Sequence, residues 1–440
     1  MLTTRFKNLF GSSPGLKFPG PGMYHFLKGE NGNSSRLHLR IDNDGSGILL
    51  LNANQIFHLN ASAAFFTFFY LSNAPIESTI SIAKRHFYTS KVDFHRDYLQ
   101  TIDLVDQLIN GQSCPICDLN LEVNAPFSTI PSAPYRMDLA ITYRCNNSCT
   151  HCYNARPSNY SELSTEKWYA ILDKLWDIGI PHIVFTGGEP TLRDDLTRLI
   201  HYAESKGQIT GLNTNARKLG NEKYLDELIQ AGLDHLQITV ESSNSKIHDL
   251  MVNHPGAWQE TMAGLKMALS KHKYVMTNTT MLKTNIHSIP GTLRMLGDIG
   301  VKTVGLNALI YSGRGSTVGT GLSESELEPI LEIAKTIIEE YGQKLIWYTP
   351  TKYCNFDPVI NNLGVKGCTA ALYNMCIESN GDVLPCQSYY TSLGNILEEN
   401  WDSIWNHDLS RSLRDRKNVS EKCKNCSLLS ECGAGCPLTN

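Results

Sequence analysis

Three cysteines carry the clearest chemistry in the sequence: Cys145, Cys149 and Cys152, spaced C-x3-C-x2-C. An iron–sulfur cube takes four ligands, and structural clusters normally use four cysteines. Three thiolates leave one iron open to bind a substrate, as a catalytic zinc keeps a vacant position. A structural zinc is the alternative, although zinc prefers four closed ligands. The triad therefore predicts a metal cluster with one open coordination position.

The triad follows the apolar run 137–142, which predicts that its loop lies at the C-terminal end of a strand. Barrels of α/β type keep their chemistry at that end. A second motif, Gly187-Gly188-Glu189-Pro190, comes directly after the predicted strand 182–186. Two glycines let the backbone approach a ligand closely, and Glu189 adds an acceptor for a cationic amine. A plain βα turn is the alternative, but the position one strand after the triad favours ligand binding.

The composition is that of an ordinary globular protein: 440 residues, 41% apolar and 19% charged. This length allows two or three domains. The net charge is −4 with no long basic run, which argues against a nucleic-acid partner. The apolar run 63–71 is too short to span a bilayer, and the N-terminus lacks an apolar signal region. We therefore expect no membrane association and a cytoplasmic location.

The cysteines are clustered as metal ligands would be. The chain has 13 of them, an odd number with C-x2-C spacings, which argues against a disulfide framework. Ten lie in the two groups 145–152 and 368–436. The other three are Cys114, Cys117 and Cys354.

The pattern of elements predicts three folded regions. After a loose lead-in at 1–22, residues 23–110 indicate a small sheet followed by three helices, with Asn60 as a helix cap. Residues 111–134 form a linker that contains Cys114-Pro115-Ile116-Cys117. Residues 135–350 alternate strand and helix six times, which favours a partial (β/α)6 barrel within an α/β fold. Residues 351–440 are short, Cys-rich segments with little core of their own, so metal is expected to organise them. The six expected barrel strands are 137–142, 182–186, 208–213, 235–240, 273–281 and 301–309.

The triad together with the Gly-Gly-Glu-Pro motif resembles the radical S-adenosylmethionine (SAM) superfamily. The resemblance implies that Cys145, Cys149 and Cys152 hold a 4Fe–4S cluster whose open iron chelates the amine and carboxylate of SAM. Reductive cleavage of SAM then gives a 5′-deoxyadenosyl radical, which abstracts a substrate hydrogen inside the barrel. It also implies a low-potential electron donor such as a flavodoxin or ferredoxin.

The same resemblance implies a set of SAM contacts: Tyr153, Thr186, Gly187, Gly188, Glu189, Pro190, Thr239 and Glu241. Val252 stands where many members have an arginine for the SAM carboxylate, and His254 or Arg217 are the candidates to replace it. Gly313-Arg314-Gly315 resembles the family's Gly-Arg-Gly turn, either as a SAM contact or as an ordinary loop. No catalytic acid or base is assigned, because Glu241, Asp357 and Tyr353 are candidates by position only.

The C-terminal cysteines resemble the SPASM extension, which carries auxiliary 4Fe–4S clusters. By this analogy a first auxiliary cluster takes Cys368 (or Cys376), Cys386 and Cys436, and a second takes Cys423, Cys426 and Cys432. The pattern normally ends with a further cysteine. We therefore expect the second cluster to have an open iron, a non-cysteine ligand, or Cys354. One auxiliary cluster plus a structural zinc is the alternative, since both accept clustered thiolates.

Residues 23–110 resemble the small winged-helix domain of the PqqD type, the RiPP recognition element. The likeness lies in the segments 37–41, 49–52 and 59–63. It implies that a leader peptide binds as an added strand on the sheet edge. A dimerisation or cap domain is the alternative. Cys114 and Cys117 fit a redox couple, half of a metal site, or neither, and are left unassigned.

Three functional hypotheses follow. The first is a radical SAM/SPASM maturase that modifies a ribosomally made precursor peptide bound through its leader. The second is a radical SAM enzyme of tetrapyrrole biosynthesis, because 412–416 and the cysteine block are also similar to haem-biosynthesis members. The third is a non-catalytic, metal-stabilised scaffold.

Overall fold

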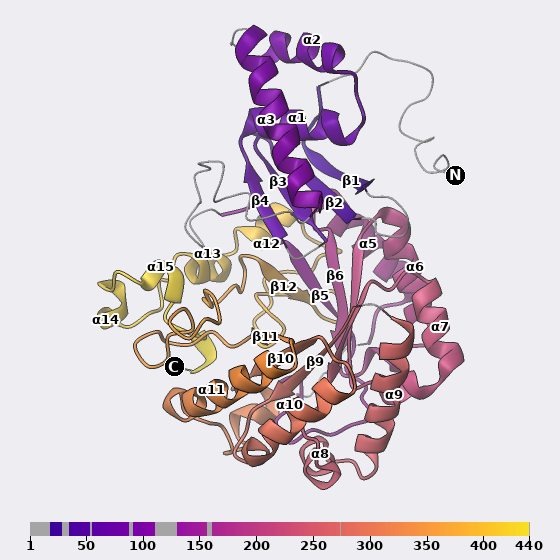
Figure 1. Ribbon diagram of the computed structural model, residues 1–440, viewed down its shortest axis with the longest axis vertical. Helices are drawn as coiled ribbons and strands as arrows, with labels where there is room; N and C mark the ends of the chain where they lie inside the picture. Colours follow the sequence, from indigo (N-terminus) through magenta and orange to yellow (C-terminus); the bar gives the residue numbers. More distant parts are fainter. Residues whose placement is uncertain are drawn as a thin grey trace. The chain divides into compact units, whose positions relative to one another are not determined.

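The computed structural model describes residues 18–28, 35–52, 55–87, 91–110, 130–155, 161–272 and 274–439. The chain divides into two compact units, Met1–Val123 and Asn124–Asn440 (Figure 1). The predicted linker motif with Cys114 and Cys117 lies outside the described residues. No helix in the described ranges is long and apolar enough to cross a membrane.

The first unit is a small antiparallel sheet with three helices, as predicted, and the sheet has four strands. Its strands are ordered β1-β2-β3-β4 in the sheet. One strand was not predicted, because β1 has a mixed apolar and polar sequence with no clear alternation. The bounds are β1 Gly22–Lys28, β2 Ser35–Ile41, β3 Gly47–Leu51, β4 Gln55–Leu59, α1 Ala61–Leu71, α2 Ile76–His86 and α3 Lys91–Asn110.

Helix α1 joins the two apolar cores of this unit. The Asn60 side chain caps it by accepting from the Ala63 backbone N–H. Leu71 packs with the sheet core, while Phe65 and Phe69 pack with α2 and α3. Helix α1 is apolar around most of its circumference, and such helices are buried within a protein core. The unit therefore has a core of its own.

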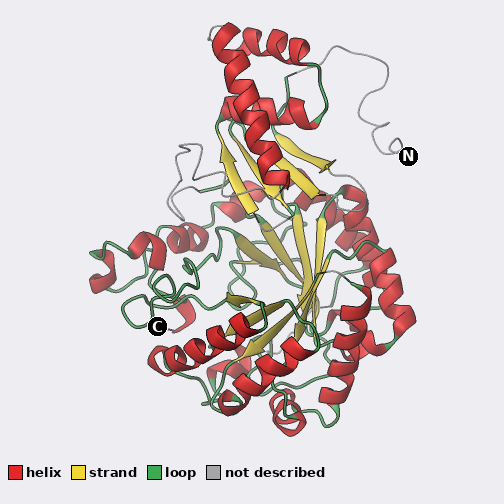
Figure 2. Ribbon diagram, viewed as in Figure 1, coloured by secondary structure: helices red, strands yellow, loops and turns green. Residues whose placement is uncertain are grey.

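The second unit contains a nine-stranded sheet within the described residues, ordered β11-β10-β9-β8-β7-β6-β5-β12-β13. Strands β5 to β11 run parallel, and helices cover one face of them (Figure 2). The strands are β5 Arg136–Thr142, β6 His182–Gly187, β7 Ile209–Thr214, β8 His235–Thr239, β9 Val275–Thr280, β10 Thr303–Asn307, β11 Lys344–Trp347, β12 Asn374–Ile377 and β13 Val383–Leu384. The covering helices are α5 Thr165–Ile178, α6 Leu196–Lys206, α7 Glu222–Gln230, α9 Ala257–Lys271, α10 Ile289–Asp298 and α11 Glu324–Glu340. Helix α8 Ser245–Val252 instead packs with Leu282 and Leu309, on loops after the strands.

The parallel strands curve into the predicted partial barrel. Met137 and Leu139 of β5 belong to the core beneath the helices, so the alternate residues of the strand point to the inner face. Tyr348, directly after β11, donates from its hydroxyl to Gln237 Oε1 of β8 at 3.0 Å. In a flat sheet these strands would lie about 14 Å apart, at three strand spacings. The contact therefore requires a curved sheet.

The C-terminal region is continuous with the barrel, and its apolar residues join the barrel core, which agrees with the prediction that it has little core of its own. Strand β12 pairs in parallel with β5, and β13 returns antiparallel after a turn at Gly381, whose φ is +95°. Leu393 and Ile404 join the main core. The sheet pairing could not be read from local sequence, because it joins segments far apart in the chain. Four short helices follow: α12 Trp401–Trp405, α13 Asp408–Arg414, α14 Glu421–Lys424 and α15 Leu429–Cys432.

Candidate active site

The cysteine triad lies on the loop that follows β5, as predicted. Burial raises the pKa of Cys149 well above its ordinary value, and nearby Cys152, Glu241 and Cys145 raise it further. Burial likewise raises the pKa of Cys145 to about 11. The three thiols are therefore close neighbours in a site that disfavours bare thiolates. Bound iron would supply the positive charge that the thiolates need, so the donor set fits an iron–sulfur cluster.

The two glycines after β6 hold this loop against the sheet. The Gly188 N–H donates to the Thr142 carbonyl at 2.7 Å, and the Glu189 N–H donates to the Arg144 carbonyl at 2.8 Å. A Cβ on Gly188 would lie 2.3 Å from the Arg144 carbonyl oxygen, which is too close for any side chain. The Asn154 amide also donates to the Gly187 carbonyl at 2.6 Å. The motif is thus a docking surface for the cysteine loop rather than a plain turn.

The Gly-Arg-Gly segment after β10 binds the same loop from the other side. The Arg314 backbone N–H donates to the Cys152 carbonyl at 2.9 Å, and its Nε donates to the Cys149 carbonyl at 2.8 Å. Gly313 has a φ of +54°, and a Cβ there would lie 2.6 Å from the Cys152 carbonyl oxygen. The sequence had left this segment as a SAM contact or an ordinary loop. It holds the carbonyl groups of Cys149 and Cys152, and its contact with SAM stays a prediction.

The candidates for the SAM carboxylate also meet at the loop. Arg217 donates from Nη1 to the Asn146 carbonyl and, at 2.8 Å, to Asn147 Oδ1. Its Nη2 lies 3.3 Å from His254 Nε2. The Val252 carbonyl accepts from the Ser148 N–H at 3.0 Å. Arg217 and His254 thus lie together beside the triad, with Arg217 engaged in holding the loop.

Glu189 is buried and keeps one acceptor position. Its Oε1 accepts from the Thr191 N–H, the Thr191 hydroxyl and the Thr214 hydroxyl, whereas among the described residues Oε2 accepts only from the Asn215 N–H, at 2.8 Å. A carboxylate oxygen has two lone pairs, so Oε2 retains one. Burial raises the pKa of this carboxyl group. A cationic amine beside Oε2 would favour the charged form, which agrees with the predicted role.

Glu241 connects β8 to the cysteine loop. Its Oε1 lies 3.0 Å from His151 Nε2, within the triad segment, and its Oε2 accepts from the Thr280 N–H at 2.9 Å. Both oxygens therefore have protein partners. Thr239, the last residue of β8, stays partly exposed opposite Asn278.

The remaining predicted SAM contacts surround the triad. Thr186 and Pro190 are buried on either side of the glycines. The Tyr153 hydroxyl donates to Gln387 Oε1 at 2.9 Å. Gln387 is the residue after Cys386, so this bond links the triad loop to the C-terminal cysteines. Sequence reasoning did not foresee the link.

Three C-terminal cysteines form a group of their own. Burial raises the pKa of Cys386 to about 12, with contributions from nearby Cys368 and Cys436. Burial raises the pKa of Cys436 to about 11, and Cys368 adds to it. Cys376 instead packs on β12 with Ala140 and Leu384. The geometry therefore favours Cys368 over Cys376 in the first predicted auxiliary site.

The second predicted auxiliary group is more open. Cys423 and Cys426 share a turn, since the Cys426 N–H donates to the Cys423 carbonyl at 3.0 Å. The Cys432 thiol accepts from the Tyr353 N–H at 3.4 Å, which places the exposed Cys354 on the neighbouring loop. In the described part of the chain, no three His, Cys, Asp or Glu side chains converge on a site for a single metal ion.

Comparison with known proteins identifies these two cysteine regions. Residues 139–296 match the radical SAM superfamily, and residues 368–427 match the SPASM iron–sulfur cluster-binding domain. The chain contains a radical SAM domain and a SPASM domain. The protein is therefore an enzyme, which rules out the scaffold hypothesis. Its cofactors are a 4Fe–4S cluster, SAM and auxiliary iron–sulfur clusters.

Two curated relatives of equal identity have names that state different activities. An AdoMet-dependent heme synthase of Methanosarcina barkeri is 28% identical over 324 residues, covering 69% of this chain and 91% of the relative. The PqqA peptide cyclase of Bradyrhizobium diazoefficiens is also 28% identical, over 316 residues that cover 69% of this chain and 81% of the relative.

Among solved structures, Streptococcus suis SuiB bound to precursor peptide SuiA has a TM-score of 0.70 and 17% identity. The match covers 94% of this chain and 96% of the SuiB chain. The anSMEcpe structure with bound AdoMet has a TM-score of 0.56 and 15% identity, and covers 69% of this chain and 90% of its own. These likenesses support the fold of the radical SAM domain, and the first extends it over nearly the whole chain.

Replacement of a SPASM-domain cysteine tests the first auxiliary site. We expect Cys386→Ala to lower the iron content by about four atoms per chain, because it removes one member of the Cys368, Cys386 and Cys436 group. The matched control is Cys376→Ala, which removes a nearby buried thiol outside that group. Iron and sulfide analysis of the purified variants measures the difference. Iron loss in the control, with full iron in Cys386→Ala, would reverse the assignment.

The inner face of the radical SAM barrel carries polar groups that sequence reasoning missed. Arg136 Nε lies 2.7 Å from Asp138 Oδ1, both on β5. His182 Nε2 of β6 lies 2.8 Å from His235 Nε2 of β8. The imidazoles reach across β7 because Gly211 leaves room, since a Cβ there would lie 2.4 Å from His235 Nε2. The available signal was Asp138 within the apolar run 137–142, with Arg136 directly before that run.

The histidine pair makes stability depend on pH. Burial, then the charges of Arg136 and His272, lower the pKa of His235 to about 4, from an ordinary value of 6.5. Between these two pH values the unfolded chain binds the proton and the folded chain does not. Stability is therefore lost as the pH falls from about 6.5 to 4, by at most about 3 kcal/mol. Thermal unfolding should show this fall, and His235→Gln should flatten it. Equal pH dependence in both proteins would contradict the prediction.

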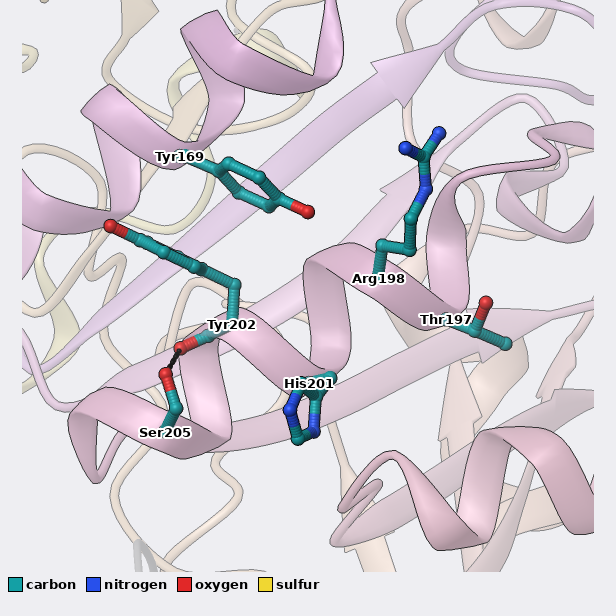
Figure 3. A pocket seen from close by; sticks show the side chains of 6 residues that line it. All are labelled: Tyr169, Thr197, Arg198, His201, Tyr202 and Ser205. Carbon is teal, nitrogen blue, oxygen red and sulfur yellow. Dashed lines mark hydrogen bonds between the residues drawn. The ribbon is translucent and has the colours of Figure 1, made fainter.

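One hollow lies away from this site. It has a volume of about 410 Å³ and sits between α5 and α6, on the helical side of the sheet (Figure 3). Tyr169 and Tyr202 stack there at 4.2 Å, and Tyr202 donates to Asp173. No cysteine or SAM-site residue lines it.

Proposed function

We propose that the protein is a radical SAM/SPASM maturase that modifies a ribosomally made peptide by hydrogen abstraction. The observation that carries this proposal is the N-terminal unit, residues 22–110. SuiB, solved with its precursor peptide, is similar over 94% of this chain, whereas the relatives named heme synthase match at most 69%. An additional folded unit with an antiparallel sheet offers an edge on which a leader peptide can bind.

The sheet of this unit has two edges on which an extended peptide can add as a strand. In the described residues, β1 pairs only with β2, and β4 pairs only with β3. Leu27 near the end of β1 is 60% exposed, and Ile56 on β4 is 38% exposed. Main-chain hydrogen bonds to an open edge supply affinity, and exposed apolar side chains supply contacts for alternate residues. The N-terminal unit thus acts as the recognition element.

The radical SAM domain would carry out the chemistry. Bound SAM and the reduced cluster supply a 5′-deoxyadenosyl radical. Cys145, Cys149 and Cys152 hold the cluster, and Glu189 Oε2 with the glycine backbone receives the SAM amine. The loop contacts of Arg314 and Glu241 keep these groups in place. A low-potential flavodoxin or ferredoxin would deliver the electron that cleaves SAM. The auxiliary clusters would accept the unpaired electron of the product radical.

A tetrapyrrole substrate is the second candidate. It is favoured by the curated relatives named heme synthase and Fe-coproporphyrin III synthase, at 25–28% identity. The PqqA peptide cyclase has a similar identity, so these matches alone do not decide between the two substrates.

The two candidates are separated by direct assay. Peptides encoded by short reading frames beside the gene are incubated with enzyme, SAM and dithionite, in parallel with iron-coproporphyrin III. The proposal expects a mass change in one peptide with matching formation of 5′-deoxyadenosine. Conversion of the porphyrin with no change in any peptide would replace the proposal by the second candidate.

A further inference from the structure

The inner wall of the barrel differs from that of an ordinary α/β barrel. Such barrels are filled by layers of branched apolar side chains. Here the inner face instead carries Arg136, Asp138, His182, His235 and Gln237. The Arg136 side chain on β5 is 33% exposed, and Tyr348, directly after β11, is 39% exposed. The wall therefore presents polar groups to whatever enters the barrel.

The Arg136–Asp138 pair has donors and an acceptor left over. Arg136 uses Nε for Asp138 Oδ1, and no acceptor in the described part of the chain engages its two Nη groups. Asp138 is 1% exposed, and its Oδ2 is buried with no hydrogen-bond partner among the described residues. A buried carboxylate oxygen without a donor is costly. The pair could therefore bind a ligand that accepts hydrogen bonds from Arg136 Nη and donates one to Asp138 Oδ2.

The charge of the wall selects the kind of ligand. Arg136 and Asp138 neutralise each other. His182 and His235 are hydrogen-bonded to each other through their Nε2 atoms. A carboxylate would meet a neutralised guanidinium beside a second carboxylate. A neutral amide has a carbonyl oxygen for Arg136 Nη and an N–H for Asp138 Oδ2. The complementary group is therefore a carboxamide or peptide group.

The pair lies in the N-terminal half of β5, whereas the triad loop follows the C-terminal end of that strand. Tyr153 follows Cys152 in the triad loop, and both Cys152 and Asp138 influence it electrostatically. The Tyr153 side chain therefore couples the pair electrostatically to the triad loop.

We propose that Arg136 and Asp138 form an amide-binding subsite that positions the peptide segment to be modified inside the barrel. This rests on the proposed function and extends it, because it assigns substrate selection in the barrel to two named residues. The amide comes either from the peptide main chain or from an Asn or Gln side chain.

Small probes test the subsite on the full-length enzyme. Crystals are soaked with N-methylacetamide, with acetamide, or with propionate, which represent the main-chain amide, the side-chain amide and the tetrapyrrole carboxylate. The proposal expects an amide with its oxygen on Arg136 and its N–H on Asp138. The amide that occupies the pair identifies the source. An empty pair, or propionate bound there, would overturn the proposal.

Ligand-observed NMR on variants provides the second measurement. Arg136→Gln and Asp138→Asn should each weaken binding of the occupying amide about tenfold, since each removes a charge-assisted hydrogen bond. Arg136→Lys keeps the positive charge and the ion pair with Asp138 but lacks the forked guanidinium donors. We expect it to bind the amide weakly as well, and because the ion pair is kept, this loss would not be due to misfolding. The matched control is Lys344→Gln, which removes an exposed charge at the start of β11 and should bind normally. Equal affinity in all four variants would overturn the subsite.

The failure of this inference is distinguishable from failure of the proposed function. If a peptide is modified and the variants bind amides normally, only the subsite is wrong. If propionate occupies the pair and the porphyrin is converted, both are wrong.

Discussion

Cys149→Ala is expected to abolish the formation of 5′-deoxyadenosine from SAM, to the background of the assay without enzyme. The reason is that we propose Cys145, Cys149 and Cys152 as the three protein ligands of the radical SAM cluster, so none would be dispensable. Iron content should fall by about four atoms per chain, while the SPASM cysteines keep their iron. The measurements are chromatography of SAM products under dithionite, together with iron analysis.

The control for this variant is Cys354→Ala, which removes an exposed thiol on a different loop. It should leave SAM cleavage intact. A Cys149→Ala enzyme that still cleaves SAM at a wild-type rate would show that the triad does not hold the catalytic cluster.

Gly188→Ala is expected to lower SAM cleavage by at least about a hundredfold. Its new Cβ would lie 2.3 Å from the Arg144 carbonyl oxygen and 2.7 Å from that of Tyr143. Both neighbours are backbone atoms, so the cysteine loop has to move away from β6. Displacements of about 1 Å in a catalytic arrangement can cost a hundredfold in rate. Steady-state cleavage assays, with SAM binding measured in parallel, test this.

Gly220→Ala is the matched control. Gly220 lies in the same unit, and a Cβ there would make only ordinary contact with Ala263 at 3.7 Å. Wild-type activity in the control and loss of activity in Gly188→Ala would locate the effect at the loop contact. Full activity in both variants would contradict the packing described here.

The barrel was predictable because its strands are local patterns. Runs such as 137–142 and 182–186 are continuous, apolar and followed by glycine or polar residues, which marks buried parallel strands. All six predicted barrel strands are present as β5 to β10. Strand β11 was missed because Lys344–Trp347 is only four residues long. The cysteine triad and the two glycines were likewise visible, since their spacing is local.

The site contacts between distant segments were not predictable. The Tyr153–Gln387 bond joins residues 234 positions apart, and the Arg314–Cys149 bond joins residues 165 positions apart. Such pairings depend on how strands close into a barrel, which no local pattern encodes. The Arg136–Asp138 pair did leave a signal, because charges within a buried strand are costly unless paired.

Deuterium transfer tests the central proposal most directly. The candidate precursor peptide is produced in deuterated form and incubated with the enzyme, SAM and dithionite, and the 5′-deoxyadenosine is analysed by mass spectrometry. A maturase that abstracts hydrogen from its peptide predicts deuterium in the 5′-deoxyadenosine, together with a mass change in the peptide. Unlabelled 5′-deoxyadenosine beside a converted tetrapyrrole and an unchanged peptide would contradict it.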